Sequence, residues 1–248
     1  MNIVFLSANK FGYEVIKEVI AMDKKAISAV ITLNDSAKTI MYDKIDSKKW
    51  DELGIKIYRI ENINDEIELL NEINPDLIMM CGWRQIINED LLKIPKEGVI
   101  GFHPTLLPIG RGPAPIINSI LNNFTESGLT MFYVSGGLDD GDIIDQEKFI
   151  IEDSDHASEV YEKVIMAGKS LIKNNFEKIL LKNLLRTKQD ENKVTVFEKP
   201  SLANNEINLN DSIEKIYSQI KALSKPYKGA YVKKDGKKLI IWRAELQK

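Results

Sequence analysis

Short apolar runs alternate with amphipathic helical segments along most of the chain, and this alternation restricts the fold more than any other feature. The first run, residues 2–6, leads through a polar loop into a helical pattern over residues 11–21. Further runs follow at 27–31, 55–58, 76–80, 98–102, 129–134 and 143–151. Strands alternating with helices form a parallel or mostly parallel sheet covered on both faces. The sequence therefore predicts an α/β, Rossmann-like domain whose ligands bind at the carboxyl ends of the strands.

The last quarter of the chain has a different pattern. A helix is predicted over residues 155–171, and the polar stretch that follows indicates a connection. A further helix over 211–223 precedes two β-runs that flank Asp235-Gly236, a strong signal for a β-hairpin. We expect a first domain at 1–180, a linker at 181–204, and a small helix-plus-β-hairpin subdomain at 205–248.

Composition excludes several classes of protein. With 44% apolar and 29% charged residues among 248, the chain is typical of an ordinary globular protein. Its apolar runs are far shorter than the ~18 residues of a membrane span, and the N-terminus has no basic leader. We expect a cytoplasmic protein with no membrane association.

Metal chemistry and nucleic-acid binding also receive little support. The single cysteine and the two histidines do not form a disulfide framework or a His-rich site, so no metal is expected. Residues 186–248 carry an excess of six positive charges within a chain of net charge −3. Because these charges are scattered, a nucleic-acid partner is not expected.

His103 is the first candidate for chemistry. It follows the apolar run at 98–102 and opens a loop stiffened by Pro104 and Pro108, so it belongs at the carboxyl end of a strand. An isolated histidine is more often structural, but this loop context favours a site. His156, in a polar segment at a helix start, is interpreted as a capping residue without a catalytic role. Arg111 leaves a Gly-x-Gly frame, where it either steers an anion or pairs with a carboxylate.

Asp139 and Asp140 lie in a glycine-rich turn, where aspartates commonly only shape the turn. Their loop and the His103 loop follow strands of the same predicted sheet, with one helix between them. We therefore expect a carboxylate to face the imidazole across one pocket, raising its basicity and fixing its tautomer.

A third strand-end loop, residues 81–85, carries an aromatic residue and a cation and is expected to line the same pocket. Cys81 is interpreted as a small core residue. The chain has no Gly-x-x-x-x-Gly-Lys-Ser/Thr loop and no Gly-x-Gly-x-x-Gly after the first strand, so nucleotide kinases and nicotinamide dehydrogenases lose support.

Three segments together resemble the folate-dependent formyltransferases. They are residues 98–108, which contain His-Pro-Thr-Leu-Leu-Pro, residues 111–115 and residues 137–144. The similarity extends from the opening residues 5–12 to the stretch 220–231 before the hairpin. The resemblance implies transfer of a formyl group from 10-formyltetrahydrofolate, as co-substrate, to an amine.

The same resemblance implies roles for individual residues. His103 corresponds to the base that removes the amine proton, and Asp139 to the residue that orients it and orders a water. Gly101 occupies the position of the family's asparagine, whose amide stabilises the oxyanion; losing such a donor typically costs about 10²- to 10³-fold in rate. Gln85 and Asn118 are conceivable substitutes. The folate is expected to contact residues in three loops: Gly82, Arg84, Ile86, Thr105, Leu106, Leu107, Pro108 and Asp139.

The short C-terminal part most resembles that of the bacterial sugar N-formyltransferases. This implies a nucleotide-linked amino sugar of surface-polysaccharide biosynthesis as acceptor, with Asn9, Lys10 and Arg111 as expected substrate-binding residues. Two alternatives stay open: a methionyl-tRNA formyltransferase, and a catalytically weak folate or nucleotide-sugar binding protein. The sequence does not identify the base, the sugar or the amine position, and it leaves a homodimer open.

Overall fold

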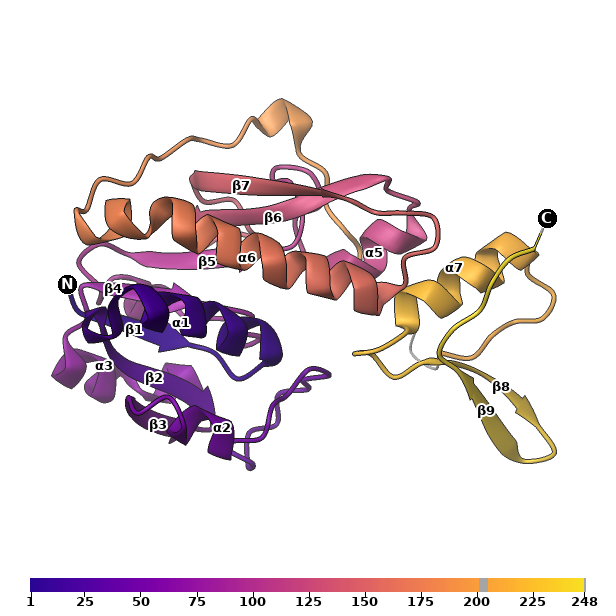
Figure 1. Ribbon diagram of the computed structural model, residues 1–248, viewed down its shortest axis with the longest axis horizontal. Coiled ribbons are helices and arrows are strands. Elements are labelled where there is room, and N and C mark those ends of the chain that lie inside the picture. The colour runs from indigo at the N-terminus through magenta and orange to yellow at the C-terminus, as the bar shows by residue number, and fades with distance from the viewer. Residues whose placement is uncertain (201–204, 248) are drawn as a thin grey trace.

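The computed structural model describes residues 1–200 and 205–247, so part of the expected linker and residue 248 lie outside the described residues. Its centre is a seven-stranded sheet with strand order β3-β2-β1-β4-β5-β6-β7 (Figure 1). The strands are β1 (Ile3–Leu6), β2 (Ile27–Leu33), β3 (Lys56–Ile60), β4 (Leu77–Met80), β5 (Val99–His103), β6 (Glu126–Tyr133) and β7 (Ile143–Ile150). The first five strands run parallel, β6 runs antiparallel to β5, and β7 runs antiparallel to β6. The predicted fold class is confirmed.

Helices cover both faces of the sheet because successive side chains of a strand point in opposite directions. Ile3 and Phe5 of β1 pack into one apolar cluster with α1 and α6, whereas Val4 and Leu6 pack into a second with α3 and α4. The helices are α1 (Lys10–Asp23), α2 (Lys48–Asp51), α3 (Ile67–Ile73), α4 (Glu89–Leu92), α5 (Pro115–Leu121), α6 (Ala157–Leu180) and α7 (Ile213–Leu223). None of them is long and apolar enough to cross a membrane. Burial on both sides explains why the strands appear in the sequence as continuous apolar runs.

Helix α6 is longer than the expected 155–171. Its core-facing positions continue beyond Leu171 with Ile172, Phe176 and Ile179, all buried. The polar residues that suggested an early end include Asn175, which is itself buried and donates to Asp145 Oδ2 at 2.7 Å and to the Leu171 carbonyl. A satisfied buried amide thus lets the helix run on through a stretch that looks like a loop in sequence.

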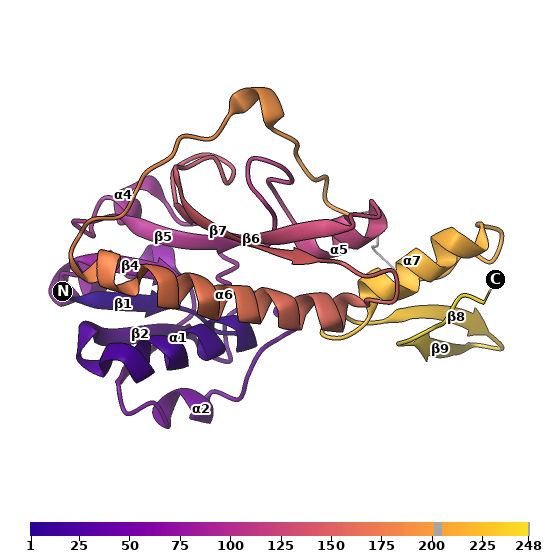
Figure 2. The same cartoon turned by 45° about the horizontal axis from the view of Figure 1, so that its top comes forward.

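The C-terminal extension docks on the first domain and contains the expected hairpin. Strands β8 (Ala230–Lys234) and β9 (Lys237–Ile241) pair antiparallel through a turn at Asp235 and Gly236, both with positive φ. Ile220 and Leu223 of α7 belong to the same apolar cluster as α1 and α6. Figure 2 shows the extension at the end of the molecule where α6 begins. It is packed onto the core rather than tethered to it.

The segment between α6 and the extension follows the sheet closely. Residues 181–200 pass along the β7 edge (Figures 1 and 2), and we call residues 187–197 the strap. Thr187 forms a bridge with Ile143, and Val196 forms one with Arg111. This segment therefore touches the loop after His103 and the start of β7, which directly follows the Asp139 loop.

Gly168 allows α1 and α6 to approach closely. A Cβ added there would lie 2.7 Å from Phe11 Cε2 and 3.0 Å from Val15 Cγ2. We predict that Gly168→Val lowers the free energy of unfolding by about 1–3 kcal/mol through overpacking. Met166→Val, on the same helix and 65% exposed, is the matched control and is expected to change it by less than about 0.5 kcal/mol. Urea denaturation of both variants measures the difference; equal stabilities would contradict the close-packing argument.

Candidate active site

His103 is the last residue of β5 and is nearly buried, with 6% of its surface exposed. Alternation along β5 places it on the same face as Gly101. Phe102 points to the opposite face, where its ring meets Phe11 edge to face at 5.7 Å. The imidazole Nε2 lies 2.8 Å from the Gly110 carbonyl oxygen. Because a carbonyl only accepts, Nε2 carries the proton in this arrangement.

Asp139 reaches His103 although the two loops do not follow parallel strands. Strand β6 runs antiparallel to β5, and its last residue, Tyr133, pairs with Ile100, at the end of β5 away from His103. The loop after β6 must therefore fold back. It does so with Asp139 at φ +48°, whose Oδ2 accepts from the Gly112 amide at 2.9 Å and lies 3.5 Å from His103 Nδ1. The expected proximity is present, although for a different reason.

Burial dominates the electrostatics of His103. It lowers the pKa of the imidazole from its usual value of about 6.5, while the Asp139 carboxylate and the Gly110 carbonyl act in the opposite direction. The ring is therefore neutral at pH 7, with its basic lone pair on Nδ1, facing Asp139. The Gly110 carbonyl sets the tautomer, and the carboxylate is placed to stabilise the imidazolium that forms when Nδ1 accepts a proton.

The space beside Gly101 is filled. A Cβ at this position would lie 2.8 Å from Val134 Cγ2 and 3.2 Å from Phe132 Cε1. The two candidate amide donors, Gln85 and Asn118, both form hydrogen bonds with other groups. Gln85 donates to Thr39 Oγ1 and to the Glu61 carbonyl. Asn118 donates to the carbonyls of Pro113 and Glu198. Neither side-chain amide is free to face His103.

The proline loop after His103 is anchored on β6 and β7. The Leu107 amide donates to Thr130 Oγ1 at 3.0 Å, and Gln146 Nε2 donates to the Leu107 carbonyl at 2.8 Å. Thr105 and Leu107 are buried, while Leu106 and Pro108 are half-buried. Of the two leucines expected to form an apolar surface, the structure leaves Leu106 partly accessible.

The loop after β4 offers backbone groups. Its flanks are held by hydrogen bonds from Asn9 to the Gly82 carbonyl and from Asn64 to the Ile86 carbonyl. Between them, the amide and carbonyl of Trp83 and Arg84 form no hydrogen bond with another described residue. Such groups suit the polar edge of a flat heterocycle. Ile86 projects into solvent, 87% exposed.

Asn9 organises the loop after β1. Its Oδ1 caps α1 through the Gly12 amide at 3.0 Å, and its Nδ2 donates to Asp43 Oδ2 and to the Gly82 carbonyl, so its amide is fully used. Lys10 pairs at the surface with Glu162. Asp43, which sequence reasoning missed, is buried and also bonded by Tyr161 and Arg84. No local motif marks it, because its partners are 34 to 118 residues away.

Arg111 forms an ion pair, which is one of the two interpretations its sequence context allowed. The residue is 7% exposed, and its Nη2 lies 2.8 Å from Glu191 Oε1. Its Nε donates to Gln189 Oε1 at 3.0 Å. Both partners belong to the strap, which the sequence marked only as linker.

Comparison with known proteins identifies the chemistry that this geometry serves. A family model described as formyl transferase matches residues 1–176, and one described as its C-terminal domain matches residues 201–248. The chain belongs to the formyl transferase family. The enzymes of this family carry out folate-dependent one-carbon transfer, so the resemblance seen in the sequence is confirmed.

Individual relatives differ in their acceptors. The methionyl-tRNA formyltransferase of Halalkalibacterium halodurans is 34% identical over 253 residues, covering 99% of this chain and 78% of the relative. An N-formyltransferase from Helicobacter canadensis, solved with folinic acid and dTDP-3-aminofucose, has a TM-score of 0.72 and 23% identity over 96% of this chain and 86% of that one. The methionyl-tRNA formyltransferase of Clostridium thermocellum has a TM-score of 0.67 and 25% identity, and the match covers 100% of this chain and 94% of that one.

The geometry predicts a distinct pH dependence for Asp139→Asn. With His103 as the expected base, the neutral imidazole is the active form, and formyl transfer should fall as the pH drops through the His103 pKa. Without the carboxylate this pKa decreases further, so the acid limb of kcat/KM moves to lower pH while kcat falls about 10²- to 10⁴-fold. Asp140→Asn is the control, because that carboxylate faces Ser135 instead. Identical profiles for both variants would remove Asp139 from the site.

The packing around Gly101 predicts that restoring the family's asparagine fails by itself. Gly101→Asn must displace Val134 and Phe132, so we expect a loss of about 1–3 kcal/mol in unfolding free energy and no gain in kcat. Gly101→Asn with Val134→Ala makes room for the side chain and is expected to recover that stability. Thermal melts and single-turnover rates check this. A stable, faster single variant would show that the space is open.

Proposed function

We propose that the protein transfers the formyl group of 10-formyltetrahydrofolate to the amine of a nucleotide-linked amino sugar. The observation that carries this acceptor class is a cluster of one aromatic ring and two cations at the same sheet edge as His103. The Tyr42 ring, 37% exposed, has the Arg84 guanidinium 5.5 Å and the Lys228 ammonium 5.7 Å from its centre. An aromatic base and a diphosphate are the groups that such a surface complements.

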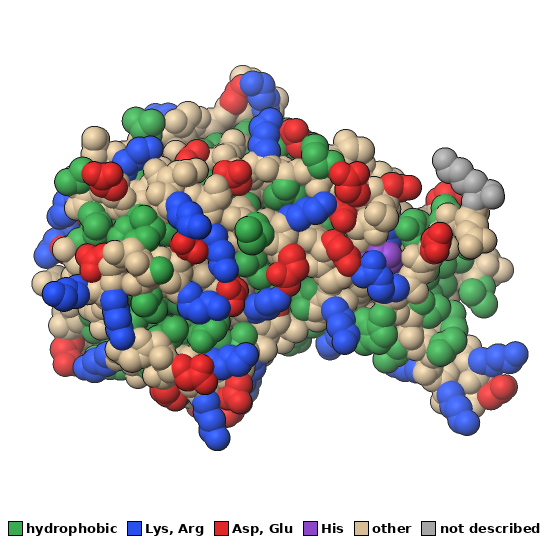
Figure 3. Space-filling view, in the orientation of Figure 1, with side chains coloured by type: hydrophobic (Ala, Val, Ile, Leu, Met, Phe, Trp, Pro, Cys, Tyr) green, Lys and Arg blue, Asp and Glu red, His purple; other side chains and the backbone are tan. Residues whose placement is uncertain are grey.

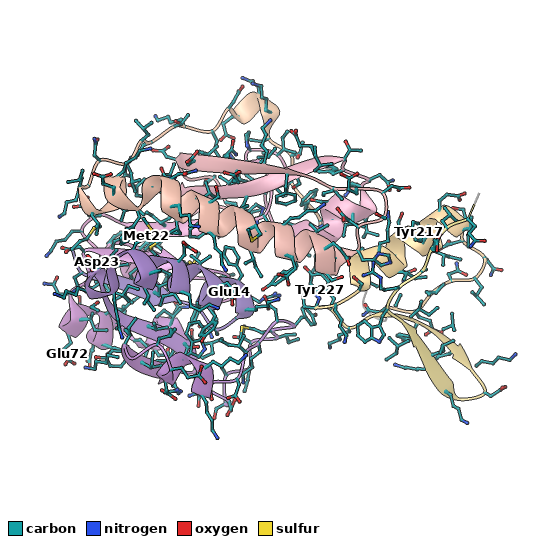
Figure 4. The ribbon with its side chains drawn as sticks, viewed as in Figure 1. Glu14, Met22, Asp23, Glu72, Tyr217 and Tyr227 are labelled. Carbon is teal, nitrogen blue, oxygen red and sulfur yellow. The ribbon has the colours of Figure 1, made fainter. Side chains whose placement is uncertain are left out.

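The cluster is built from three separate parts of the chain. Arg84 follows β4 and is held by Asp43 at 3.2 Å. Tyr42 belongs to the loop after β2, and its ring meets Tyr227 edge to face at 5.6 Å. Figure 4 shows Tyr227 at the junction between the first domain and the extension. The extension therefore completes this surface, with Lys228 beside Tyr227.

The cations of the cluster have room for an anionic ligand. Lys228 pairs with no carboxylate among the residues that the structure describes, and Asp43 engages only Nη2 of Arg84. Strand β4, which leads to Arg84, is the neighbour of β5, and paired strands lie about 5 Å apart. An acceptor bound here by its phosphates extends naturally toward His103. In this proposal Arg84 and Lys228 bind the phosphates of the acceptor, in place of Asn9 and Lys10, which the sequence suggested as substrate-binding residues.

The folate side of the site rests on the two remaining loops. The free backbone groups of Trp83 and Arg84 provide hydrogen bonds for a pterin-like ring, and Leu106 provides an apolar contact. 10-Formyltetrahydrofolate supplies the formyl carbon. A folinic acid complex of the Helicobacter canadensis enzyme supports a folate at this fold's site.

The residues present account for the proton movements of the transfer. The neutral acceptor amine attacks the formyl carbon and a C–N bond forms. His103 Nδ1 takes the amine proton, and Asp139 stabilises the resulting imidazolium. The same proton then passes to the folate nitrogen as its bond to the formyl carbon breaks. His103 is neutral again, and the formylated sugar and tetrahydrofolate leave.

Initiator methionyl-tRNA is the rival acceptor, since the more identical relatives act in that reaction by name. The surface visible in Figure 3 mixes Lys and Arg with Asp and Glu side chains rather than gathering them by sign. Nucleic-acid binding relies on clustered positive charge. The Tyr42 cluster is local, and it fits a ligand the size of a nucleotide sugar.

Acceptor choice is tested by supplying purified protein with a panel of nucleotide-linked amino sugars, or with methionyl initiator tRNA, at one concentration of 10-formyltetrahydrofolate. We expect turnover with a sugar nucleotide. Arg84→Met and Lys228→Met should raise the KM for that sugar about 10- to 100-fold, because each removes a charge-assisted contact, and leave the KM for folate unchanged.

Lys237→Met, at the hairpin tip outside the cluster, is the matched control and should leave both KM values unchanged. Turnover with tRNA alone would overturn the proposed acceptor. Equal effects of Arg84→Met and Lys237→Met would remove the cluster from the binding site.

A further inference from the structure

A single polar side chain of the strap is buried. Over residues 181–200, only Gln189 and Phe197 are buried, and the other side chains are half-buried or exposed. Apolar packing explains the burial of Phe197, because its ring lies 5.9 Å from that of Phe124, measured between ring centres. Apolar packing does not explain the burial of Gln189, which is 8% exposed and polar. Burying an amide is unfavourable unless its hydrogen bonds are made, so its contacts explain its place.

The Gln189 amide makes three hydrogen bonds that join two loops. Its Oε1 accepts from Arg111 Nε at 3.0 Å, and its Nε2 donates to the carbonyls of Asp139 at 2.7 Å and Gly141 at 2.8 Å. Because carbonyls only accept, the orientation of the amide is fixed, and both of its N–H groups are used. One side of Gln189 thus binds the loop after His103, and the other binds the loop that carries Asp139.

The Asp139 loop needs such an anchor. It leaves β6 at the end of the sheet away from His103 and has to fold back over the face of β5. Glycines at 136, 137 and 141 give its backbone freedom, and Asp139 sits at positive φ. Strand pairing does not restrain residues 135–141. The Asp139 carboxylate itself has only the Gly112 amide as hydrogen-bond partner among the described residues.

We propose that Gln189 is a positioning residue for formyl transfer: by holding the Asp139 and Gly141 carbonyls, it keeps the Asp139 carboxylate facing His103 Nδ1. This rests on the proposed roles of His103 and Asp139 in the family's reaction. Gln189 touches neither reacting group. It acts by fixing the backbone of the Asp139 loop. Without this restraint, the Asp139 carboxylate would move away from His103 Nδ1, from which it now lies 3.5 Å.

The charged groups around His103 make the effect measurable. Asp139 is the charge whose field raises the His103 pKa. Arg111, on the neighbouring loop, is turned toward Gln189 and Glu191, and Asp140 is bonded to Ser135. Displacing Asp139 should therefore appear as a lower His103 pKa. The chain has only two histidines, so imidazole ¹⁵N resonances report His103 directly, with His156 as internal reference.

The experiment compares Gln189→Met with Glu191→Gln and Asp139→Asn in the full chain. Methionine keeps the length and volume of Gln189 but has none of its three hydrogen bonds. We expect the His103 pKa in Gln189→Met to move from the wild-type value toward that of Asp139→Asn, with His156 unchanged. We also expect kcat to fall about 10- to 100-fold at an unchanged KM for 10-formyltetrahydrofolate, as a misplaced catalytic group predicts.

Glu191→Gln is the matched control. It removes the other strap contact of the Arg111 guanidinium, but the Glu191 side chain is 71% exposed and such a pair contributes little. Its titration and kcat should equal those of the wild type. If Gln189→Met does not fold, Gln189→Asn, whose amide is one methylene too short to span both loops, replaces it in the same comparison.

Wild-type His103 titration and kcat in the folded Gln189 variant, with only a lower Tm, would overturn the proposal and leave Gln189 a stabilising residue. Because the titration needs no acceptor, a wrong acceptor assignment does not affect it. If Asp139→Asn leaves the His103 pKa unchanged, the proposed catalytic pair itself fails, which is a separate outcome.

Discussion

An imidazole and a carboxylate 3.5 Å apart are held together here by contacts that lie outside the sheet. Strand pairing delivers His103 to its position, because β5 has a fixed register against β4 on one side and His103 itself pairs with Thr130 of β6 on the other. Strand pairing places the start of the Asp139 loop far from His103, since β6 ends opposite Ile100, at the other end of β5. The return is secured by the Gly112 amide and the Gln189 side chain. The site therefore depends on a few polar contacts of loops and strap, which cost free energy if left unmade in a buried setting.

This dependence gives the strap, which lies between the two matched domains, a structural role beyond connecting them. The strap bonds to the Asp139 loop, to the loop after His103 and, through Thr187, to the start of β7. Its exposed side chains make it look like a linker in sequence, because only Gln189 and Phe197 turn inward. A segment with so few buried positions has no hydrophobic period to detect. Its function follows from its hydrogen bonds, which are specified by residues far away in the chain.

Features that depend on nearby residues could be predicted from the sequence, and features that depend on contacts with distant residues could not. The β-runs, the hairpin at Asp235-Gly236 and the strand-end position of His103 depend on periodicity and on nearby turn residues, and these were predicted. The end of α6 was not, because Asn175 finds its partner Asp145 thirty residues away. Asp43, Gln189 and the direction of β6 likewise depend on contacts across the sheet. The pairing of His103 with Asp139 was expected because both loops follow strands of one sheet, but β6 runs antiparallel to β5, and the two residues meet only because the Asp139 loop folds back.

Apolar packing beside Gly101 distinguishes this site from the one that the family resemblance implies. Where relatives are expected to place an amide, Val134 and Phe132 already occupy the space, 2.8 and 3.2 Å from the point that a Cβ of residue 101 would take. The family resemblance implies an oxyanion donor at this position, and the structure shows apolar side chains packed there instead. His103 itself is buried, and a buried setting of low dielectric strengthens the interaction between an imidazolium and the Asp139 carboxylate in the proposed proton transfer. The burial that lowers the His103 pKa in the resting enzyme is thus the same feature that makes the placement of Asp139 matter, and with it the contacts that hold Asp139 in place.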